Sequence, residues 1–329
     1  MKSPSWFAVI VATFLAAGCM PTGGIRITPV PEDRTLRERV VARDPGLFLP
    51  KVAIIDIDGI ITNNETGGLF SDGEHPVSLL VEKLRAAERD KAVKAVVLRI
   101  NSPGGGVTAS DLMYHEVNRF RTRTRKPVIA MLMDVAASGG YYLACAADEI
   151  VMTPTGVTGS IGVIMQTVDL SGTLHKLGIG MEPIKSGVHK DSGSPFRPMR
   201  EEERQLFQDI INHLYERFVQ VVKDGRPNVD PAKLQTIADG RVLTAEDALE
   251  NGLIDRIGTV DDAIAAVKAR AAIKKARVVV YHRPLGWRPT VYAQAGPYQM
   301  PTTVNLINVS VPGLFTNDTP FMYLWRIDQ

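Results

Sequence analysis

Hydrophobic and polar positions follow two different periods along most of the chain. Short apolar runs predict buried strands, and longer segments with apolar residues at helical spacing predict helices. The predicted strands are 52–57, 93–100, 127–133, 149–152 and 160–167, and the predicted helices are 77–89, about 108–121, a segment after Ser138, 201–223, 231–237, 244–250 and 260–274. Strands alternating with helices of this length indicate stacked βαβ units, and therefore an α/β fold with a mainly parallel sheet and a helical C-terminal part.

The composition is that of an ordinary globular protein and narrows the classes of function. The chain has 329 residues, of which 45% are hydrophobic and 22% charged, and its net charge is +2. This near-neutral balance gives no support to nucleic-acid binding. Neither of the two cysteines lies in a CxxC or Cys/His cluster, and the six histidines lack metal-ligand spacing. We therefore predict no metal and no other cofactor. A GxxxxGK[ST] loop is missing from the sequence, so ATP-driven unfolding is not expected.

The first residues resemble an export signal. Lys2 precedes an apolar run from Trp6 to Ala17, which is too short to span a bilayer comfortably and has the length of a signal-peptide core. The following LAAGC resembles the bacterial lipobox, although Leu15 lies one position farther from the cysteine than in the commonest pattern. We predict a lipoprotein signal with lipid on Cys19, and the alternatives are an uncleaved membrane anchor or an ordinary export signal. Each of the three takes the chain out of the cytoplasm.

Changes of composition along the chain predict four parts. Residues 1–19 form the signal peptide, and residues 20–47, rich in Pro, Arg and Asp, form a flexible tether. Residues 48–275 form one catalytic domain, and residues 276–329 form a C-terminal extension whose role the sequence leaves open. The second cysteine, Cys145, falls in the domain, where we predict a small buried apolar residue.

A serine between small residues is the first candidate for chemistry. Ser138 lies between two alanines and two glycines, where the strand 127–133 turns into a helix. It is either an N-cap or a nucleophile that its small neighbours expose to a substrate. In the second case the N–H of Gly139 would face the oxyanion of a tetrahedral intermediate.

A glycine-rich segment supplies a second candidate donor. The sequence NSPGGG, Asn101 to Gly106, follows the end of a predicted strand, where ligands gather in open parallel sheets. Glycines there let a backbone amide approach a carbonyl group closely. Gly105 is the predicted second oxyanion donor.

The general base is the least determined element. His189 and Lys190 both lie in the loop-like segment KSGVHKDSGSPFRPMR, residues 185–200. Histidine is the usual partner of a catalytic serine, and a lysine can serve where burial lowers its pKa towards neutrality. The residues alone do not decide whether His189 or Lys190 is the general base.

Several segments together resemble one known family. NSPGGGV, AASGGYYLACAADEI, TGSIGV, SGVHKDSGSPFRPMREEE and DGRVLTAEDALENGLID, in this order over about residues 50–270, closely resemble the signal peptide peptidase A (SppA) family, in its short single-unit form. The resemblance implies a serine protease with a Ser/Lys dyad on a fold related to the caseinolytic protease and crotonase families. It places the nucleophile on Ser138, the base on Lys190 in preference to His189, and the oxyanion donors on Gly105 and Gly139.

The resemblance also implies substrates and partners. The expected substrates are short apolar peptides, such as released signal peptides, cleaved through an acyl-enzyme outside the cytoplasm. The expected assembly is a ring- or dome-shaped homo-oligomer, in which serine and lysine can come from neighbouring subunits. Family members usually keep an uncleaved transmembrane anchor, and this chain offers a lipobox instead. Two alternatives remain: an anchored scaffold of the same fold without activity, and a crotonase-type acyl-CoA enzyme, for which no catalytic carboxylates can be identified.

Overall fold

The computed structural model describes residues 35–64, 74–283 and 321–325 of the chain. Cys19 and the predicted signal peptide lie outside these residues. In chain order the elements are β1 (Arg37–Arg43), β2 (Lys51–Asp58), α2 (Pro76–Arg89), β3 (Val93–Ser102), β4 (Gly104–Gly106), α3 (Val107–Thr124), β5 (Val128–Ala137), α4 (Gly139–Ala144), β6 (Glu149–Met152), β7 (Val157–Gly159), α5 (Ser171–Lys176), α6 (Glu201–Gly225), α7 (Pro231–Ile237), β8 (Val242–Thr244), α8 (Ala245–Glu250), β9 (Arg256–Ile257), α9 (Val260–Arg270), β10 (Arg277–His282) and β11 (Met322–Leu324).

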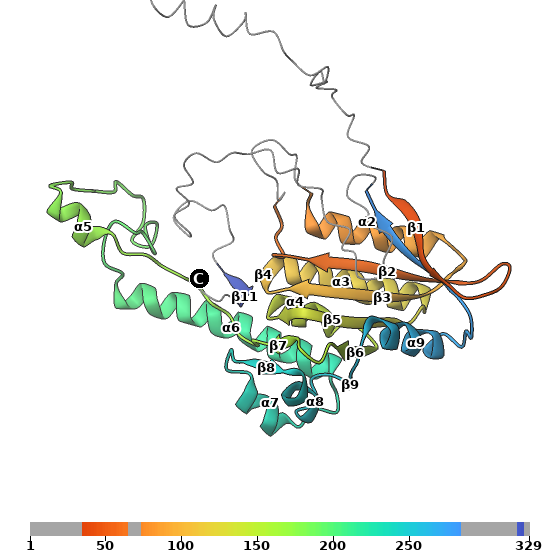
Figure 1. Ribbon diagram of the computed structural model, residues 1–329. Helices are drawn as coiled ribbons and strands as arrows, with labels where there is room; N and C mark the ends of the chain where they lie inside the picture. Colours follow the sequence, from red (N-terminus) through yellow and green to blue (C-terminus); the bar gives the residue numbers. More distant parts are fainter. Residues whose placement is uncertain (1–34, 65–73, 284–320, 326–329) are drawn as a thin grey trace, which may run out of the picture. The chain divides into compact units, whose positions relative to one another are not determined.

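Nine of the described strands form one large, mostly parallel sheet covered on both faces, and β4 and β11 form a separate two-stranded sheet. The order of the large sheet is β1-β10-β2-β3-β5-β6-β9, and β7 and β8 continue it beside the end of β5. Alternate residues of β3 enter two separate cores: Val96 and Leu98 pack with residues of α2, α3 and α4, whereas Val97 packs with residues of α9. Figure 1 shows α2 and α9 on opposite sides of the strands. Burial on both faces explains why the central strands are continuous apolar runs, and the predicted α/β class is confirmed.

The sheet extends beyond the limits expected for the catalytic domain. β1 lies within the segment 20–47 that we expected to be a tether, and it pairs antiparallel with β10, which lies beyond residue 275. β10 in turn pairs parallel with β2. As an edge strand whose side chains are almost all exposed, β1 has the polar sequence RERVVAR, and this polarity hid it from a hydrophobicity pattern.

The predicted strand 160–167 is not observed. The strand in this region is the shorter β7, and Ser160, which follows it, has a φ of 49°, which turns the chain out of the sheet. Between 160 and 167 a single isolated bridge joins Ile164 to Met322. The apolar run SIGVIM therefore marks a segment that packs beside another piece of chain rather than a sheet strand.

A long excursion separates β7 from α6. We call residues 168–200 the arm, and it contains the short helix α5. Figure 1 shows the arm extending beyond the first turn of α6, away from the strands. The long helix that we predicted over 201–223 is present as α6. Among the described residues, no helix combines the length and apolar character that crossing a membrane requires.

Candidate active site

Ser138 occupies a strained turn between β5 and α4. Its φ is 53° and its ψ −117°, a backbone conformation that costs a non-glycine residue about 1–3 kcal/mol. Two backbone hydrogen bonds hold the turn: Ser138 N–H donates to the Gly159 carbonyl, and Tyr142 N–H donates to the Ser138 carbonyl, both at 2.8 Å. The Ser138 side chain makes no capping hydrogen bond to α4. Ser138 thus holds the N-cap position of α4 without capping the helix through its side chain, and this strand–turn–helix geometry is compatible with a nucleophile.

The two glycines after Ser138 allow α4 to approach the end of β3. A Cβ on Gly140 would lie 2.7 Å from the Ser102 carbonyl oxygen, and one on Gly139 would overlap the Ser110 hydroxyl. Both distances are too short for a side chain. The sequence SGG therefore brings the first backbone amide of α4 next to the glycine-rich segment.

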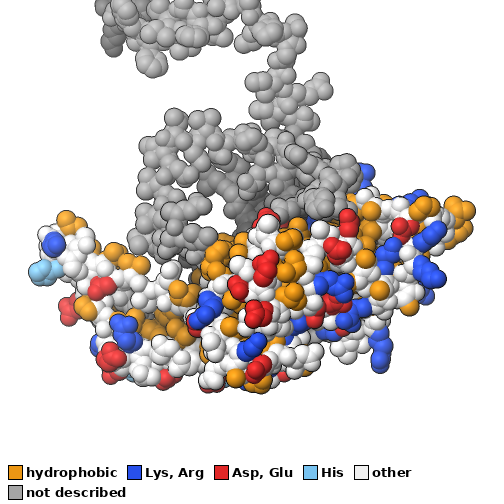
Figure 2. Space-filling view, turned by 60° about the horizontal axis from the view of Figure 1, so that its bottom comes forward, with side chains coloured by type: hydrophobic (Ala, Val, Ile, Leu, Met, Phe, Trp, Pro, Cys, Tyr) orange, Lys and Arg blue, Asp and Glu red, His pale blue; other side chains and the backbone are white. Residues whose placement is uncertain are grey.

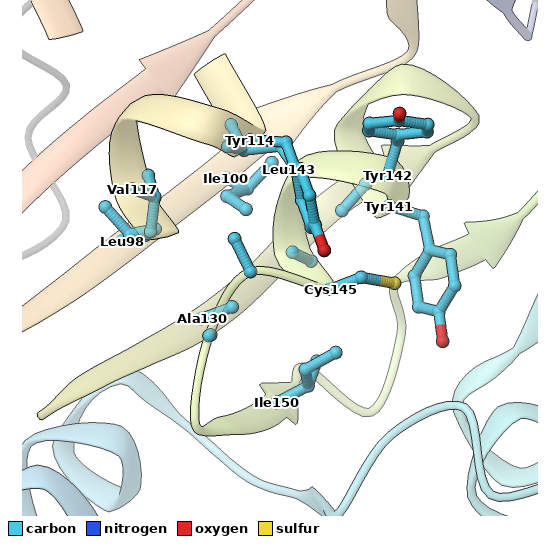
Figure 3. Packing of buried hydrophobic residues seen from close by; sticks show 14 of the residues in the cluster. Leu98, Ile100, Tyr114, Val117, Ala130, Tyr141, Tyr142, Leu143, Cys145 and Ile150 are labelled. Carbon is cyan, nitrogen blue, oxygen red and sulfur yellow. The ribbon is translucent and has the colours of Figure 1, made fainter. Parts of the chain in front are cut away.

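α4 is anchored by the two tyrosines that follow these glycines. Figure 3 shows Tyr141 and Tyr142 leaving the helix in different directions. The Tyr141 hydroxyl donates to the Leu253 carbonyl at 2.7 Å, and the Tyr142 hydroxyl donates to Asp111. Cys145 at the end of α4 is buried, as predicted, and burial raises the pKa of its thiol to about 12. This thiol therefore remains protonated at neutral pH and is not a second nucleophile.

The backbone N–H and C=O groups of the glycine-rich segment β4 point in two opposite directions. The Gly104 carbonyl and the Gly106 N–H both bond to Ile61, at 2.8 Å each. Because alternate residues of a strand point their backbone groups in opposite directions, the N–H of Gly105 faces away from Ile61. A Cβ on Gly105 would collide with the Ile61 carbonyl, so this position requires glycine.

A second segment lies on the side that Gly105 faces. β11 runs antiparallel to β4, with Tyr323 opposite Gly105. Trp325 N–H donates to the Pro103 carbonyl at 2.8 Å, two residues away in the ladder. Since hydrogen-bonded pairs alternate in an antiparallel ladder, Gly105 and Tyr323 also form such a pair, and the Gly105 N–H points to the Tyr323 carbonyl.

A peptide carbonyl thus lies where the candidate oxyanion donors meet. A Cβ on Gly104 would lie 2.6 Å from the Gly139 nitrogen and still closer to the Tyr323 carbonyl oxygen. This oxygen, the Gly139 N–H and the Gly105 N–H therefore share one small space beside Ser138. Sequence analysis missed the part played by Gly104, whose φ of +97° and lack of a side chain keep that space open.

Lys190 and His189 lie elsewhere, in the exposed arm. Lys190 donates its backbone N–H to the Gly187 carbonyl at 3.2 Å, and its side chain is exposed to solvent. Within the described residues, no hydrogen bond connects Lys190 or His189 to Ser138. One chain therefore brings together Ser138, Gly105 and Gly139, but neither candidate base.

An ionic network fixes the segment that carries Lys190. Asp191 binds Lys185 (2.6 Å) and Arg197 (2.9 Å), and Glu203 in the first turn of α6 binds Arg197 and Arg200. The Arg197 guanidinium holds the pKa of both carboxyl groups well below their usual range. The Glu203 side chain has no exposed surface although it is charged, so its partners must remain in place. The network fastens the end of the arm to α6.

No set of three or more His, Cys, Asp or Glu side chains is arranged to hold a metal ion in the part of the chain that the structure describes.

Comparisons with known proteins identify the family of the chain. A model of the Clp protease family matches residues 73–158, and a model of peptidase family S49 matches residues 121–274. A protein of Enterococcus faecium described as a signal peptide peptidase SppA is 37% identical over 238 residues, 72% of this chain and 69% of that protein. The chloroplastic serine protease SPPA of Arabidopsis thaliana is 38% identical over 251 residues, 75% of this chain and 36% of that protein. Protease 4 of Haemophilus influenzae is 32% identical over 214 residues, 65% of this chain and 34% of that protein.

Fold and comparisons together define a serine peptidase with a Clp protease-like α/β domain. The chain belongs to peptidase family S49. It matches about a third of the length of the Arabidopsis and Haemophilus proteins and most of the length of the Enterococcus one.

Proposed function

We propose that Ser138 is the nucleophile of this peptidase and that the N–H groups of Gly105 and Gly139 bind the oxyanion. The observation that carries the proposal is that the Gly139 nitrogen and the Tyr323 carbonyl oxygen, which the Gly105 N–H faces, lie next to each other beside Gly104 and a strained serine. Donors fixed in advance around the developing charge are commonly the largest contribution to acyl-transfer catalysis. Here the backbone supplies both donors, so they need no reorganisation during the reaction.

The general base is Lys190 of a neighbouring copy of the chain. In a single chain this lysine is exposed on the arm, while Ser138 is buried. The arm also exposes an unusual number of large apolar side chains, namely Val168, Leu177, Ile179, Met181, Ile184, Val188 and Phe196. Figure 2 shows hydrophobic side chains along the arm, among its charged ones. A second copy packed against this surface would cover the apolar groups and would bury the lysine close to a serine.

The reaction follows from these positions. The neutral amine of Lys190 takes the Ser138 proton while the hydroxyl oxygen attacks a peptide carbonyl carbon, and Gly105 and Gly139 hold the oxyanion. The lysine then protonates the leaving amine, and a water molecule repeats the sequence to hydrolyse the acyl-enzyme. Burial of the lysine within an assembly is the condition for its neutral form at physiological pH.

The substrates that fit this site are short, extended, apolar peptides, such as the remnants of signal peptides. A peptide that enters between β4 and Ile164 as an additional strand forms main-chain hydrogen bonds that do not depend on its sequence. The proposed place of action is the bacterial cell envelope, outside the cytoplasm, where lipid on Cys19 would hold the chain at a membrane. The mass of the mature N-terminus tests the lipid directly.

A serine-reactive fluorophosphonate tests the catalytic assignment. The full chain should be labelled at Ser138, as shown by mass spectrometry of the modified peptide. The Ser138→Ala variant should lose the label and the peptidase activity while it keeps the wild-type circular dichroism spectrum. A matched control is Ser171→Ala, which changes a partly exposed serine at the start of α5. Labelling that persists in Ser138→Ala would contradict the assignment.

The two alternatives predict different results in the same experiment. An inactive scaffold would neither react with the fluorophosphonate nor hydrolyse peptides. A crotonase-type enzyme would turn over thioesters and leave peptides intact. The matches to peptidase family models favour neither alternative.

A further inference from the structure

Two adjacent apolar side chains are exposed in the loop between β1 and β2. Leu47 is 82% exposed, and Phe48 is completely exposed. We call these two residues the apolar tip. Figure 1 shows the loop projecting beyond the strands on the side opposite to the arm, and in Figure 2 hydrophobic side chains form the same extremity, with Lys and Arg side chains beside them. Adjacent exposed apolar side chains on a projecting loop are typical of a surface that binds a partner or a membrane.

The loop holds the apolar tip in a defined conformation. The Arg43 guanidinium donates to the Gly46 carbonyl at 3.0 Å, and the side chain of Leu49 is buried against Gly46. Phe48 has a φ of 54°, which a bulky residue adopts only where its surroundings impose it. The exposure of the tip is therefore a feature of an ordered loop.

The base of the loop lies at the edge of the sheet where the parallel strands begin. Asp44 accepts hydrogen bonds from the Lys268 amine at 2.7 Å and from the Ala276 N–H at 2.8 Å. At the other end of the loop, the Arg277 N–H donates to the Pro50 carbonyl at 2.8 Å. These bonds join the loop to the end of α9 and the start of β10, so the tip projects from a fixed base.

Exposed lysines without an acidic partner lie next to the starts of β3 and β10 at this edge. In the residues that the structure describes, no ion pair involves Lys91, Lys94, Lys274 or Lys275. The nearby carboxylates already have partners, Asp44 in Lys268 and Asp90 in Lys51, both at 2.7 Å. Lysine 268 chiefly, and Lys275 as well, lower the pKa of the Asp44 carboxyl, so positive charge reaches the base of the loop.

From these observations we infer that the apolar tip inserts into the surface of a bilayer that contains anionic phospholipids, while the four lysines bind the lipid phosphate groups. Apolar side chains flanked by lysines enter the boundary between headgroups and acyl chains in this way. A second copy fits the surface less well, because a symmetric contact would bring the same lysines of both copies together.

Insertion at this edge would also orient the peptidase. Ser138 follows the last residue of β5, whereas the apolar tip precedes the first residue of β2, and these strands run parallel in one sheet. The proposed nucleophile thus lies at the edge of the sheet opposite to the tip. The inference concerns a surface that the proposed catalytic groups do not use, and it holds or fails independently of them.

A spin label at the tip tests insertion in the full chain. Phe48→Cys carries the nitroxide, Cys19→Ala removes the proposed lipid site, and Cys145 stays unlabelled because its thiol is buried. With vesicles of phosphatidylcholine and phosphatidylglycerol, collisions with oxygen and with a water-soluble nickel complex should place the label about 5–10 Å into the headgroup region. Ile184→Cys, at an equally exposed apolar residue of the arm, is the matched control, and its label should not change when vesicles are added.

Removing charge tests the part played by the lysines. Lys274→Gln and Lys275→Gln should each lower the ratio of inserted to uninserted label about fivefold on the anionic vesicles. Added salt should lower the same ratio. Lys233→Gln, which changes an exposed lysine of α7, is the matched control and should leave the ratio unchanged.

Three results would overturn the inference. The label at position 48 could remain in water while the chain is bound to the anionic vesicles. It could insert equally into vesicles of phosphatidylcholine alone. It could already be shielded from the nickel complex without vesicles and keep that environment after their addition, which would show that a second copy covers the tip. Leu47→Cys gives a second labelling position, for which the same depth is expected.

Discussion

The cleft around Ser138 and the arm that carries Lys190 are built in opposite ways. In the cleft, position is set by the backbone: β5, β7 and the glycines of β4 and α4 fix each group, and the side chains are buried. In the arm, position is set by ion pairs around Asp191 and Glu203, and apolar side chains face solvent.

This difference indicates which of the proposed catalytic groups a single chain can position without a partner. A site held by main-chain hydrogen bonds and close packing keeps its geometry without a partner. An exposed arm with unsatisfied apolar surface acquires its final surroundings on association. In the proposed mechanism, the nucleophile and the oxyanion donors therefore come from one chain, and the base becomes functional on association.

Among substitutions in the arm, removing the amine of Lys190 should have the largest effect on catalysis. We expect Lys190→Ala to lower kcat by about a thousandfold, because the serine loses its general base. Lys176→Ala, which changes another exposed lysine of the arm, should leave kcat unchanged. Steady-state kinetics on a fluorogenic peptide measure both. A loss of kcat in Lys176→Ala of equal size would show that the arm needs its charge and not one particular amine.

Filling the oxyanion space should have the next largest effect, on the cleft side. In Gly104→Ala the new methyl group would occupy the place of the substrate carbonyl, and φ would have to remain near +97°. We expect kcat/KM to fall on the order of a hundredfold or more. Gly172→Ala in α5 is the matched control, since a Cβ there meets nothing within 4 Å. Unchanged kinetics in Gly104→Ala would contradict the placement of the oxyanion.

Weakening the ion pairs around Glu203 should lower kcat less than removing the amine of Lys190 does. Glu203→Gln takes one charge from Arg197 and Arg200 and leaves Lys190 intact, so we expect kcat to fall by less than about a hundredfold. Glu202→Gln is the control, because Glu202 is exposed and pairs with Arg200 only at the surface (3.3 Å). Equal effects of the two substitutions would show that the buried position of Glu203 has no special part in placing the arm.

As the pH falls, the arm should lose local stability before the region around Ser138 does. The folded-state pKa values of Asp191 and Glu203 are lowered, chiefly by Arg197, so both carboxylates stabilise the fold at neutral pH and lose that contribution as pH falls below about 4. Hydrogen exchange, corrected for the intrinsic rate at each pH, should therefore accelerate in residues 187–200 on acidification. Peptides from β5 and α4 should change less. Equal acceleration in both regions would contradict the difference in stability between the arm and the region around Ser138.

The sequence predicted the cleft better than its surroundings. The strand–SGG–helix pattern predicted the turn at Ser138, and NSPGGG predicted the close backbone approach at Gly105, because glycine spacing reports backbone geometry directly. β1 escaped prediction because an exposed edge strand has no hydrophobic period. The ring contacts among Tyr142, Phe218 and Tyr323 escaped prediction because the three residues come from distant segments, and nothing local in FMYLW indicates that its tyrosine meets α4. Whether Lys190 reaches a serine depends on a second copy, which one sequence does not describe.

A complementation experiment tests the shared site most directly. Ser138→Ala and Lys190→Ala chains, each inactive alone, are mixed and allowed to exchange subunits, and exchange is verified by native mass spectrometry. If serine and lysine come from different copies, random assembly should restore about a quarter of the wild-type activity, the chance that one site receives both intact residues. Activity no higher than the sum of the two separate variants, despite verified exchange, would contradict the account.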